Sequence, residues 1–103
     1  MTDRNIIRGL VVDELMEANE KYPLFHSPHE AYAVLLEEVD ELRQDLKSID
    51  AYMQYMWRRV KQDESMEEAS RRVYNYAISM VQEGIQVAAM CLKVNESKLY
   101  NDK

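Results

Sequence analysis

The chain of 103 residues contains only two glycines, two prolines and one cysteine. So few turn-forming residues argue against a β-sandwich or barrel, which needs a turn about every 8–12 residues. They also leave no glycine-rich loop of the kind that holds phosphates in P-loop and dinucleotide-binding proteins. Together with a hydrophobic content of 47%, these absences predict one all-α domain covering residues 1–103.

The net charge and the shortness of the apolar runs argue against a nucleic-acid-binding protein and a membrane protein. The formal net charge of -6 disfavours nucleic-acid binding, which depends on Lys and Arg displacing counterions from phosphates. The longest apolar runs, at 31–36 and 87–92, are too short for a membrane span of about 20 residues, and residues 1–5 do not begin a signal peptide. Cys91 has no partner for an internal disulfide. We therefore expect a cytoplasmic protein with neither a nucleic-acid nor a membrane partner.

Capping residues mark several helix boundaries. Ser27-Pro28-His29-Glu30 combines an N-cap serine, a proline at the first helical position and a glutamate at the third. A second capping box runs from Ser65 to Glu68, and Asp50 is a candidate N-cap between the two. Pro23 ends the first helical pattern. These signals predict a four-helix bundle, with helices at about 3–21, 28–48, 51–62 and 66–98.

Three acidic residues fall within or beside apolar stripes, where an ionised carboxylate is costly unless it is paired. On a helical wheel, Glu38 lies inside the apolar sector of helix 28–48 and Glu41 lies at its edge. Glu83 lies at the edge of the stripe of the last helix. The two stripes consist of Ala31, Leu35, Val39, Leu42 and Leu46, and of Val73, Ala77, Met80, Gly84, Val87, Ala88 and Cys91.

Three explanations of this placement remain open. The acids form an ordinary solvated face, or nearby Arg and Lys pair with them, or a hard divalent cation lies among them. Carboxylate oxygens suit Mg²⁺ and Mn²⁺. Glu38 and Glu41, three residues apart, can reach one ion from one helix, and a third acid from a facing helix would complete the set.

The segment Glu37-Glu38-Val39-Asp40-Glu41 has the pattern EExxE. With its flanking residues 29–42 and the later segment 86–90, it resembles the MazG-like nucleoside triphosphate pyrophosphohydrolases, particularly the small members found in phages and prophages. The resemblance covers about residues 26–47 and 80–94. It implies a dimeric or tetrameric helical bundle that binds Mg²⁺ through EExxE and a later ExxD pair. The implied reaction is hydrolysis of a nucleoside triphosphate to the monophosphate and pyrophosphate.

Carried onto this chain, the resemblance implies that Glu38, Glu41 and Glu83 are metal ligands, with Glu83 in the first position of ExxD. Glu37 is a weaker candidate ligand, and either Glu37 or Glu41 is the general base. Gln86 stands in the last position of ExxD, where the family has an aspartate. Either this ligand position is lost, or Gln86 supports the ligands without contacting the metal. An alternative function is therefore a catalytically weak or inactive helical oligomer that binds a nucleotide or a protein.

Substrate-binding groups are expected among the basic and aromatic residues. The outer phosphates of a triphosphate need cationic side chains, and a nucleobase can stack on an aromatic ring. An ordinary alternative exists for each candidate, because surface cations are usually just solvated and a tryptophan is usually buried. The candidates are Arg58, Arg59 and Lys61, then Arg71 and Arg72, for the phosphates, and Trp57 for the base.

His26 and His29 are disfavoured as a zinc pair because no cysteine or acid completes a ligand set, and Cys91 is expected to be a small core residue rather than a nucleophile.

Apolar residues on a second side of the last helix predict self-association. Ile78, Ile85 and Ala89 form this second stripe, and Met53 and Met56 add apolar surface to helix 51–62. A helix that is apolar on two sides is buried on two sides. We therefore expect a homodimer or homotetramer with the last helix in the interface.

Overall fold

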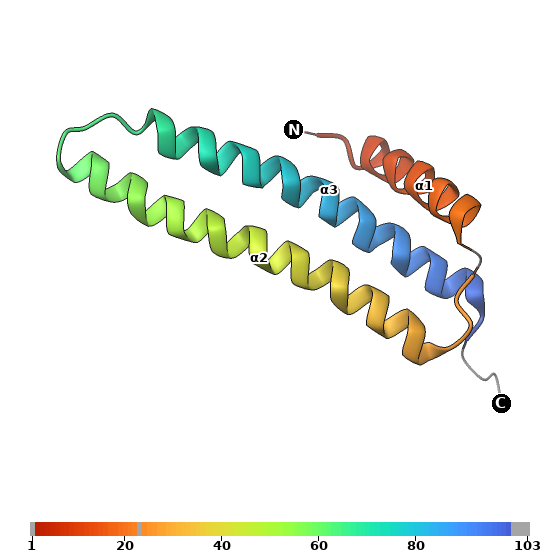
Figure 1. Cartoon of the computed structure of the whole chain (residues 1–103). Coiled ribbons are helices and arrows are strands. Elements are labelled where there is room, and N and C mark those ends of the chain that lie inside the picture. The colour runs from red at the N-terminus through yellow and green to blue at the C-terminus, as the bar shows by residue number, and fades with distance from the viewer. Residues whose placement is uncertain (1, 23, 100–103) are drawn as a thin grey trace.

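The computed structural model describes residues 2–22 and 24–99, which form three α-helices and no strand. The helices are α1 (Arg4–Lys21), α2 (Pro28–Lys61) and α3 (Glu67–Ser97). Helices α2 and α3 form a long antiparallel hairpin, and α1 packs against the C-terminal half of α3 (Figure 1). The all-α fold class is therefore confirmed.

Helix α2 runs without interruption for 34 residues, so the predicted break between helices 28–48 and 51–62 is wrong, and with it the four-helix count. Asp50 is an exposed residue inside α2 rather than an N-cap. An aspartate in a helix interior costs less than about 1 kcal/mol relative to alanine. A break would leave up to four N–H and four C=O groups without helical partners. Since no glycine or proline lies between 29 and 61, continuation is the cheaper outcome.

Apart from the one at 51, the predicted helix starts agree with the observed ones to within one residue. The Ser27 hydroxyl accepts a hydrogen bond from the Glu30 backbone N–H at 3.1 Å, as an N-cap should. The N-cap of α3 is Met66, which makes no capping side-chain hydrogen bond, so the predicted N-cap at Ser65 is wrong by one residue; the Ser65 hydroxyl accepts a hydrogen bond from the Glu67 N–H at 3.2 Å. Helix α1 begins after Asp3, whose carboxylate accepts from the Asn5 N–H at 2.7 Å.

A small core lies between α1 and α3. Val11 and Leu15 of α1 pack around Ala89 of α3, which has no exposed surface, and Ile85 packs against the same cluster. Two of the three residues in the predicted second stripe are therefore covered by α1 of the same chain. Only Ile78 of that stripe stays open to solvent, with 47% of its surface exposed.

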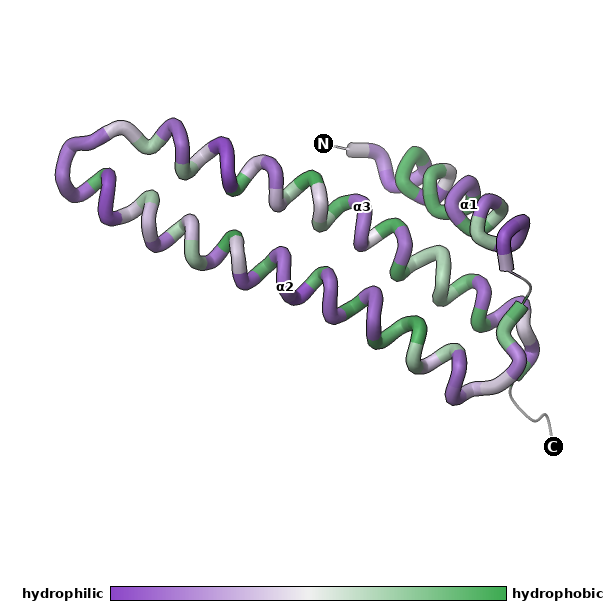
Figure 2. Tube along the Cα trace, viewed as in Figure 1, coloured by the Kyte–Doolittle hydropathy of each residue, from purple (hydrophilic) through white to green (hydrophobic). Residues whose placement is uncertain are grey.

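The protein is elongated, with extents of 62 × 27 × 26 Å. Its radius of gyration is 17.9 Å, against about 13 Å for a compact domain of this size. The end of the hairpin remote from α1 consists of two helices alone, whereas apolar residues gather where α1 meets α3 (Figures 1 and 2). A two-helix hairpin buries one face of each helix, so side chains on the other faces remain exposed.

Two residues assigned to the core by the wheel are exposed in the structure. Leu46 of α2 and Cys91 of α3 are both open to solvent, so the expectation that Cys91 is a core residue is wrong. Leu46 is exposed because no third helix packs over it, whereas Cys91 borders an open hollow between α1 and α3. None of the helices within 2–22 and 24–99 is apolar over a length that would cross a membrane.

Candidate metal centre

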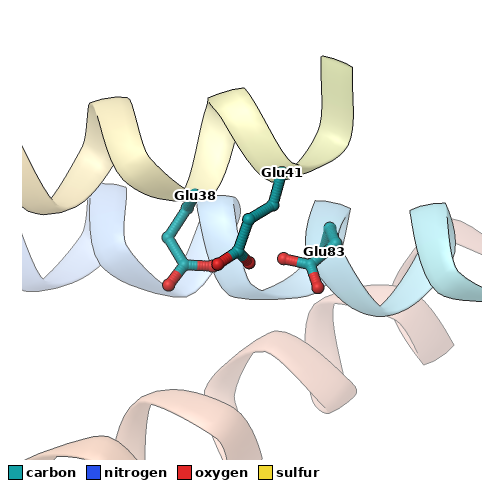
Figure 3. Close-up of side chains that lie close together, drawn as sticks. All are labelled: Glu38, Glu41 and Glu83. Atoms are coloured by element: carbon teal, nitrogen blue, oxygen red, sulfur yellow. The ribbon is translucent and has the colours of Figure 1, made fainter. Parts of the chain in front are cut away.

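Three glutamates from two helices converge between α2 and α3. Glu38 and Glu41 project from α2 and Glu83 projects from α3, with their carboxyl groups directed toward one another (Figure 3). One carboxylate oxygen of each residue lies within 4.8 Å of the corresponding oxygens of the other two. The structure thus brings together the three acids that the sequence singled out.

Local helical periodicity explains this convergence. Glu38 and Glu41 are three residues apart on α2 and therefore share one face. Glu38 directly precedes Val39, and Glu41 directly precedes Leu42. Val39 and Leu42 are partly buried and place that face toward α3. Glu83 precedes the partly buried Gly84 on α3, so the antiparallel pairing sets it opposite the two acids of α2.

The cluster contains carboxylate oxygens that are buried without a hydrogen-bond partner. The Oε2 atoms of both Glu38 and Glu83 are in this condition, while Glu41 is exposed. A buried polar atom without a partner costs on the order of 1–3 kcal/mol, and more if it is charged. Such an arrangement is unfavourable unless a proton or a cation is shared among the acids.

This environment raises the pKa values of Glu83 and Glu38. Burial, followed by the neighbouring Glu41 and Glu38, raises the pKa of Glu83 to about 7. Burial also raises the pKa of Glu38, and the charges of Glu41, Glu37 and Glu14 add to the effect. Without a cation, the coupled acids therefore bind a proton more tightly than isolated glutamates do, up to about pH 7.

Pairing with basic side chains does not explain the cluster. The ion pairs of the described residues join Arg43 to Asp40, Arg59 to Glu64 and Arg72 to Glu68, and none includes Glu38, Glu41 or Glu83. A plainly solvated face is also a poor description, because Glu38 and Glu83 are partly buried. Of the three explanations drawn from the sequence, a divalent cation among the acids suits these observations best.

The donor set fits a hard divalent ion. Two oxygens on one Mg²⁺ are separated by at most about 4.2 Å, and on one Ca²⁺ by up to about 5.2 Å. Adjacent ligands on Mg²⁺ are only about 3.0 Å apart, so carboxylate oxygens separated by up to 4.8 Å have to move closer together around the ion, which rotation of glutamate side chains supplies. Three carboxylates leave coordination positions for water and phosphate oxygens.

Acids on α1 extend the negative surface in a way that the sequence reasoning missed. The Glu14 carboxylate contributes to the raised pKa of Glu38. Glu14 and Glu17 line a shallow hollow together with Glu38 and Gln86. The signal was available, because Glu14 follows the buried Val11 by three residues and precedes the buried Leu15. Gln86 lies in this hollow beside Glu14 and Glu17 of α1.

The remaining candidates do not join the cluster. Glu37 is exposed and acts on Glu38 only through its charge. His26 and His29 belong to no group of potential metal ligands within the described ranges.

The predicted substrate-binding residues lie far from the acids within one chain. Trp57 follows Glu41 by 16 residues on the same helix, which corresponds to about 24 Å along its axis. Trp57 is 59% exposed rather than buried, and the Lys61 ammonium lies 5.8 Å from its ring centre. The Arg58 guanidinium lies over the Tyr55 ring at 5.9 Å.

Two of the other basic candidates, Arg59 and Arg72, have structural partners. The Arg59 guanidinium pairs with Glu64 at 2.6 Å and donates to the Ser65 carbonyl at 2.9 Å, which holds the turn between α2 and α3. Arg71 is exposed, and the Arg72 guanidinium lies 6.0 Å from the Tyr52 ring centre. Arg71 and Arg72 precede Glu83 by at least 11 residues on α3, or roughly 16 Å. None of these basic side chains therefore lies beside the acid cluster within one chain.

No protein-family model matches the chain, and the comparisons with curated proteins and with solved structures found no similar protein.

Proposed function

We propose that this protein is a Mg²⁺-dependent nucleotide pyrophosphohydrolase that cleaves a ribo- or deoxyribonucleoside triphosphate to the monophosphate and pyrophosphate. The observation that carries the proposal is the convergence of Glu38, Glu41 and Glu83 from two helices, with buried oxygens that lack partners. The resemblance of segment 37–41 to the EExxE pattern of MazG-like enzymes supports the same reaction. Mn²⁺ is an alternative ion, since it prefers the same oxygen ligands.

Each acid has a task in this reaction. Glu38, Glu41 and Glu83 hold the ion, which when bound neutralises the triphosphate and polarises a phosphoryl oxygen. A water attacks the α-phosphorus, the bond from that phosphorus to the bridging α–β oxygen breaks, and pyrophosphate leaves. Glu41 or Glu37 accepts the proton of the water. Glu41 is in the cluster and Glu37 is beside it, so a comparison of the two variants assigns the base.

Release of pyrophosphate from a panel of the common nucleoside triphosphates tests this proposal. We expect Mg²⁺-dependent release by the wild type and its loss in Glu38→Gln, Glu41→Gln and Glu83→Gln, which keep the size of each side chain. Glu20→Gln, on the exposed side of α1, is the matched control and should keep full activity. Failure of the wild type to release pyrophosphate from any triphosphate, with Mg²⁺ or Mn²⁺, would refute the proposed reaction.

A second function, binding without turnover, is favoured by Gln86. Its neutral amide replaces the acid expected at the last position of ExxD, and its side chain lies in the hollow beside Glu38. A carboxylate there would add a fourth oxygen ligand near the cluster. We expect Gln86→Asp to tighten Mg²⁺ binding in calorimetry. If wild type binds a nucleotide without hydrolysing it while Gln86→Asp hydrolyses it, the chain is a binding module.

A second copy of this chain is the partner that the shape favours. The hairpin end remote from α1 exposes Met53, Trp57, Tyr74 and Ile78, each with at least 47% of its surface open. Met53 and Trp57 share one face of α2, and Tyr74 and Ile78 share one face of α3, because the members of each pair are four residues apart. Contiguous exposed apolar side chains of this kind mark interaction surfaces. Association of two hairpins through these ends would bury these side chains. A homodimer or homotetramer is therefore part of the proposal.

A further inference from the structure

A cavity of about 480 Å³ opens beside the acid cluster. It lies between the C-terminal end of α1, the start of α2 and the C-terminal part of α3, with the connection from α1 to α2 along one side. Its volume lies within the range of about 300–1,000 Å³ typical of small-molecule sites. The residues that line it include Tyr22, Phe25, Val34, Glu38, Met90 and Lys93.

Lys93 is a buried cation in the wall of this cavity. Only 3% of its surface is exposed, and it takes part in none of the ion pairs among residues 2–22 and 24–99. Its ammonium donates one long hydrogen bond, at 3.4 Å, to the Tyr22 carbonyl and lies 5.0 Å from the centre of the Phe25 ring. An ammonium has three N–H donors and no acceptor. At least one donor therefore remains for a ligand, and a ligand that accepts it would offset the cost of burying the charge.

The position of Glu38 connects the cavity to the acids. Glu38 lines the cavity and also belongs to the three-carboxylate cluster. A ligand that fills the cavity therefore has its neighbouring atoms at the proposed metal site. A nucleotide meets this requirement, because its planar base is joined through the sugar to the phosphates. The apolar side chains of Val34 and Met90 suit the faces of a base, and Lys93 supplies a polar group that fixes its orientation.

We propose that this cavity binds the nucleobase of the substrate and that Lys93 selects bases that carry a keto oxygen. This inference rests on the proposed pyrophosphohydrolase function. Uracil, thymine, cytosine and guanine each present a keto oxygen that accepts a hydrogen bond. Adenine has no keto oxygen: it presents a donating amino group where guanine has O6, and its acceptors are the ring nitrogens N1, N3 and N7. The preference is thus for keto bases over adenine.

Binding of free nucleosides tests the cavity separately from hydrolysis. Uridine and adenosine have no phosphate and need no metal, so each is titrated into the ¹⁵N-labelled protein in EDTA and followed by amide chemical shifts. We expect uridine to shift the amides of Phe25, Met90 and Lys93, and adenosine to bind about 10- to 100-fold more weakly, as loss of one hydrogen bond to a charged group requires. Equal or stronger binding of adenosine, or no shift at the cavity with uridine, would overturn the inference.

The variant Lys93→Met removes the donors and keeps the length of the side chain. We expect it to abolish the difference between uridine and adenosine, while Lys47→Met, at an exposed site on α2, leaves it unchanged. Thermal melting checks that both variants fold. If Lys93→Met does not fold, the comparison of the two nucleosides in the wild type still decides. A preference for uridine that survives in folded Lys93→Met would show that Lys93 does not select the base.

The two proposals fail in different ways. Selective uridine binding without pyrophosphate release from any triphosphate would remove the proposed reaction and leave a nucleoside site. Mg²⁺-dependent hydrolysis with equal kcat/KM for UTP and ATP, unchanged by Lys93→Met, would leave the reaction and remove the base selection.

Discussion

The acid cluster makes the stability of the metal-free protein fall as the pH rises. The folded state raises the pKa of Glu83 to about 7, from 4.5 for an unperturbed glutamate. The folded state therefore binds the proton more tightly than the unfolded state does. The resulting contribution to the free energy of unfolding is fully present below pH 4.5 and is lost as the pH rises through about 7.

The size of this loss follows from the change in pKa. A shift from 4.5 to about 7, at about 1.4 kcal/mol per unit, sets an upper limit of about 3.5 kcal/mol. Solvent around the partly exposed Glu83 and Glu41 reduces the value below that limit. Since a domain of this size is stabilised by only about 5–15 kcal/mol, the change is large enough to measure.

Urea denaturation in EDTA, followed by far-ultraviolet circular dichroism between about pH 5 and pH 8, measures the effect. We expect the free energy of unfolding of the wild type to fall over this range. Glu83→Gln, which cannot ionise, should show a much smaller fall, and the exposed Glu20→Gln should behave as wild type. Excess Mg²⁺ should restore stability at pH 8, because the ion replaces the proton. The reasoning is refuted if Glu83→Gln and wild type show the same dependence on pH.

Three further predictions concern the metal, the helices and the assembly. Mg²⁺ at about 100 times its dissociation constant should add about 2.7 kcal/mol to the folded state, a rise in melting temperature on the order of 10 °C, and Glu38→Gln should abolish it. An unchanged wild-type melting curve over a wide range of Mg²⁺ and Mn²⁺ concentrations would contradict this. Ser27→Ala should cost about 1 kcal/mol by removing the N-cap of α2, whereas Asp50→Ala should raise stability by up to about 0.7 kcal/mol, because Asp50 lies inside the helix; urea titrations compare the two. Light scattering should give a mass that is a multiple of the 12.2 kDa chain, and Ile78→Glu should lower it; a wild-type monomer would remove the proposed interface.

The sequence was informative about features that depend on residues close together in the chain. The N-cap at Ser27 and the start of α3 near Ser65 follow from side chains that bond within three residues. The placement of Glu38 and Glu41 on one face of α2 follows from helical periodicity in the same way. The break predicted at Asp50 was also wrong for a local reason. A single candidate N-cap residue does not interrupt a segment that is otherwise helical throughout.

Features that depend on which helices pack together required the tertiary structure. Ala89 is buried because α1 folds back onto α3, and a wheel of α3 alone assigns it to an interface with another copy. The burial of Lys93 could not be predicted from the sequence either. Lys93 is buried because the segment after α1 places Tyr22 and Phe25 against it. Trp57 is remote from the acids because α2 is a single rod that carries it about 24 Å away.

The amino-acid sequence by itself determined that the chain is helical and which acids share a face, since both are consequences of the backbone geometry of one helix. Only the tertiary structure decided that Glu83 meets Glu38 and Glu41 with buried, unpartnered oxygens, and that a cavity with Lys93 in its wall adjoins them. The physical reason is that burial and pKa depend on what lies within a few ångströms in space, which one helix cannot specify.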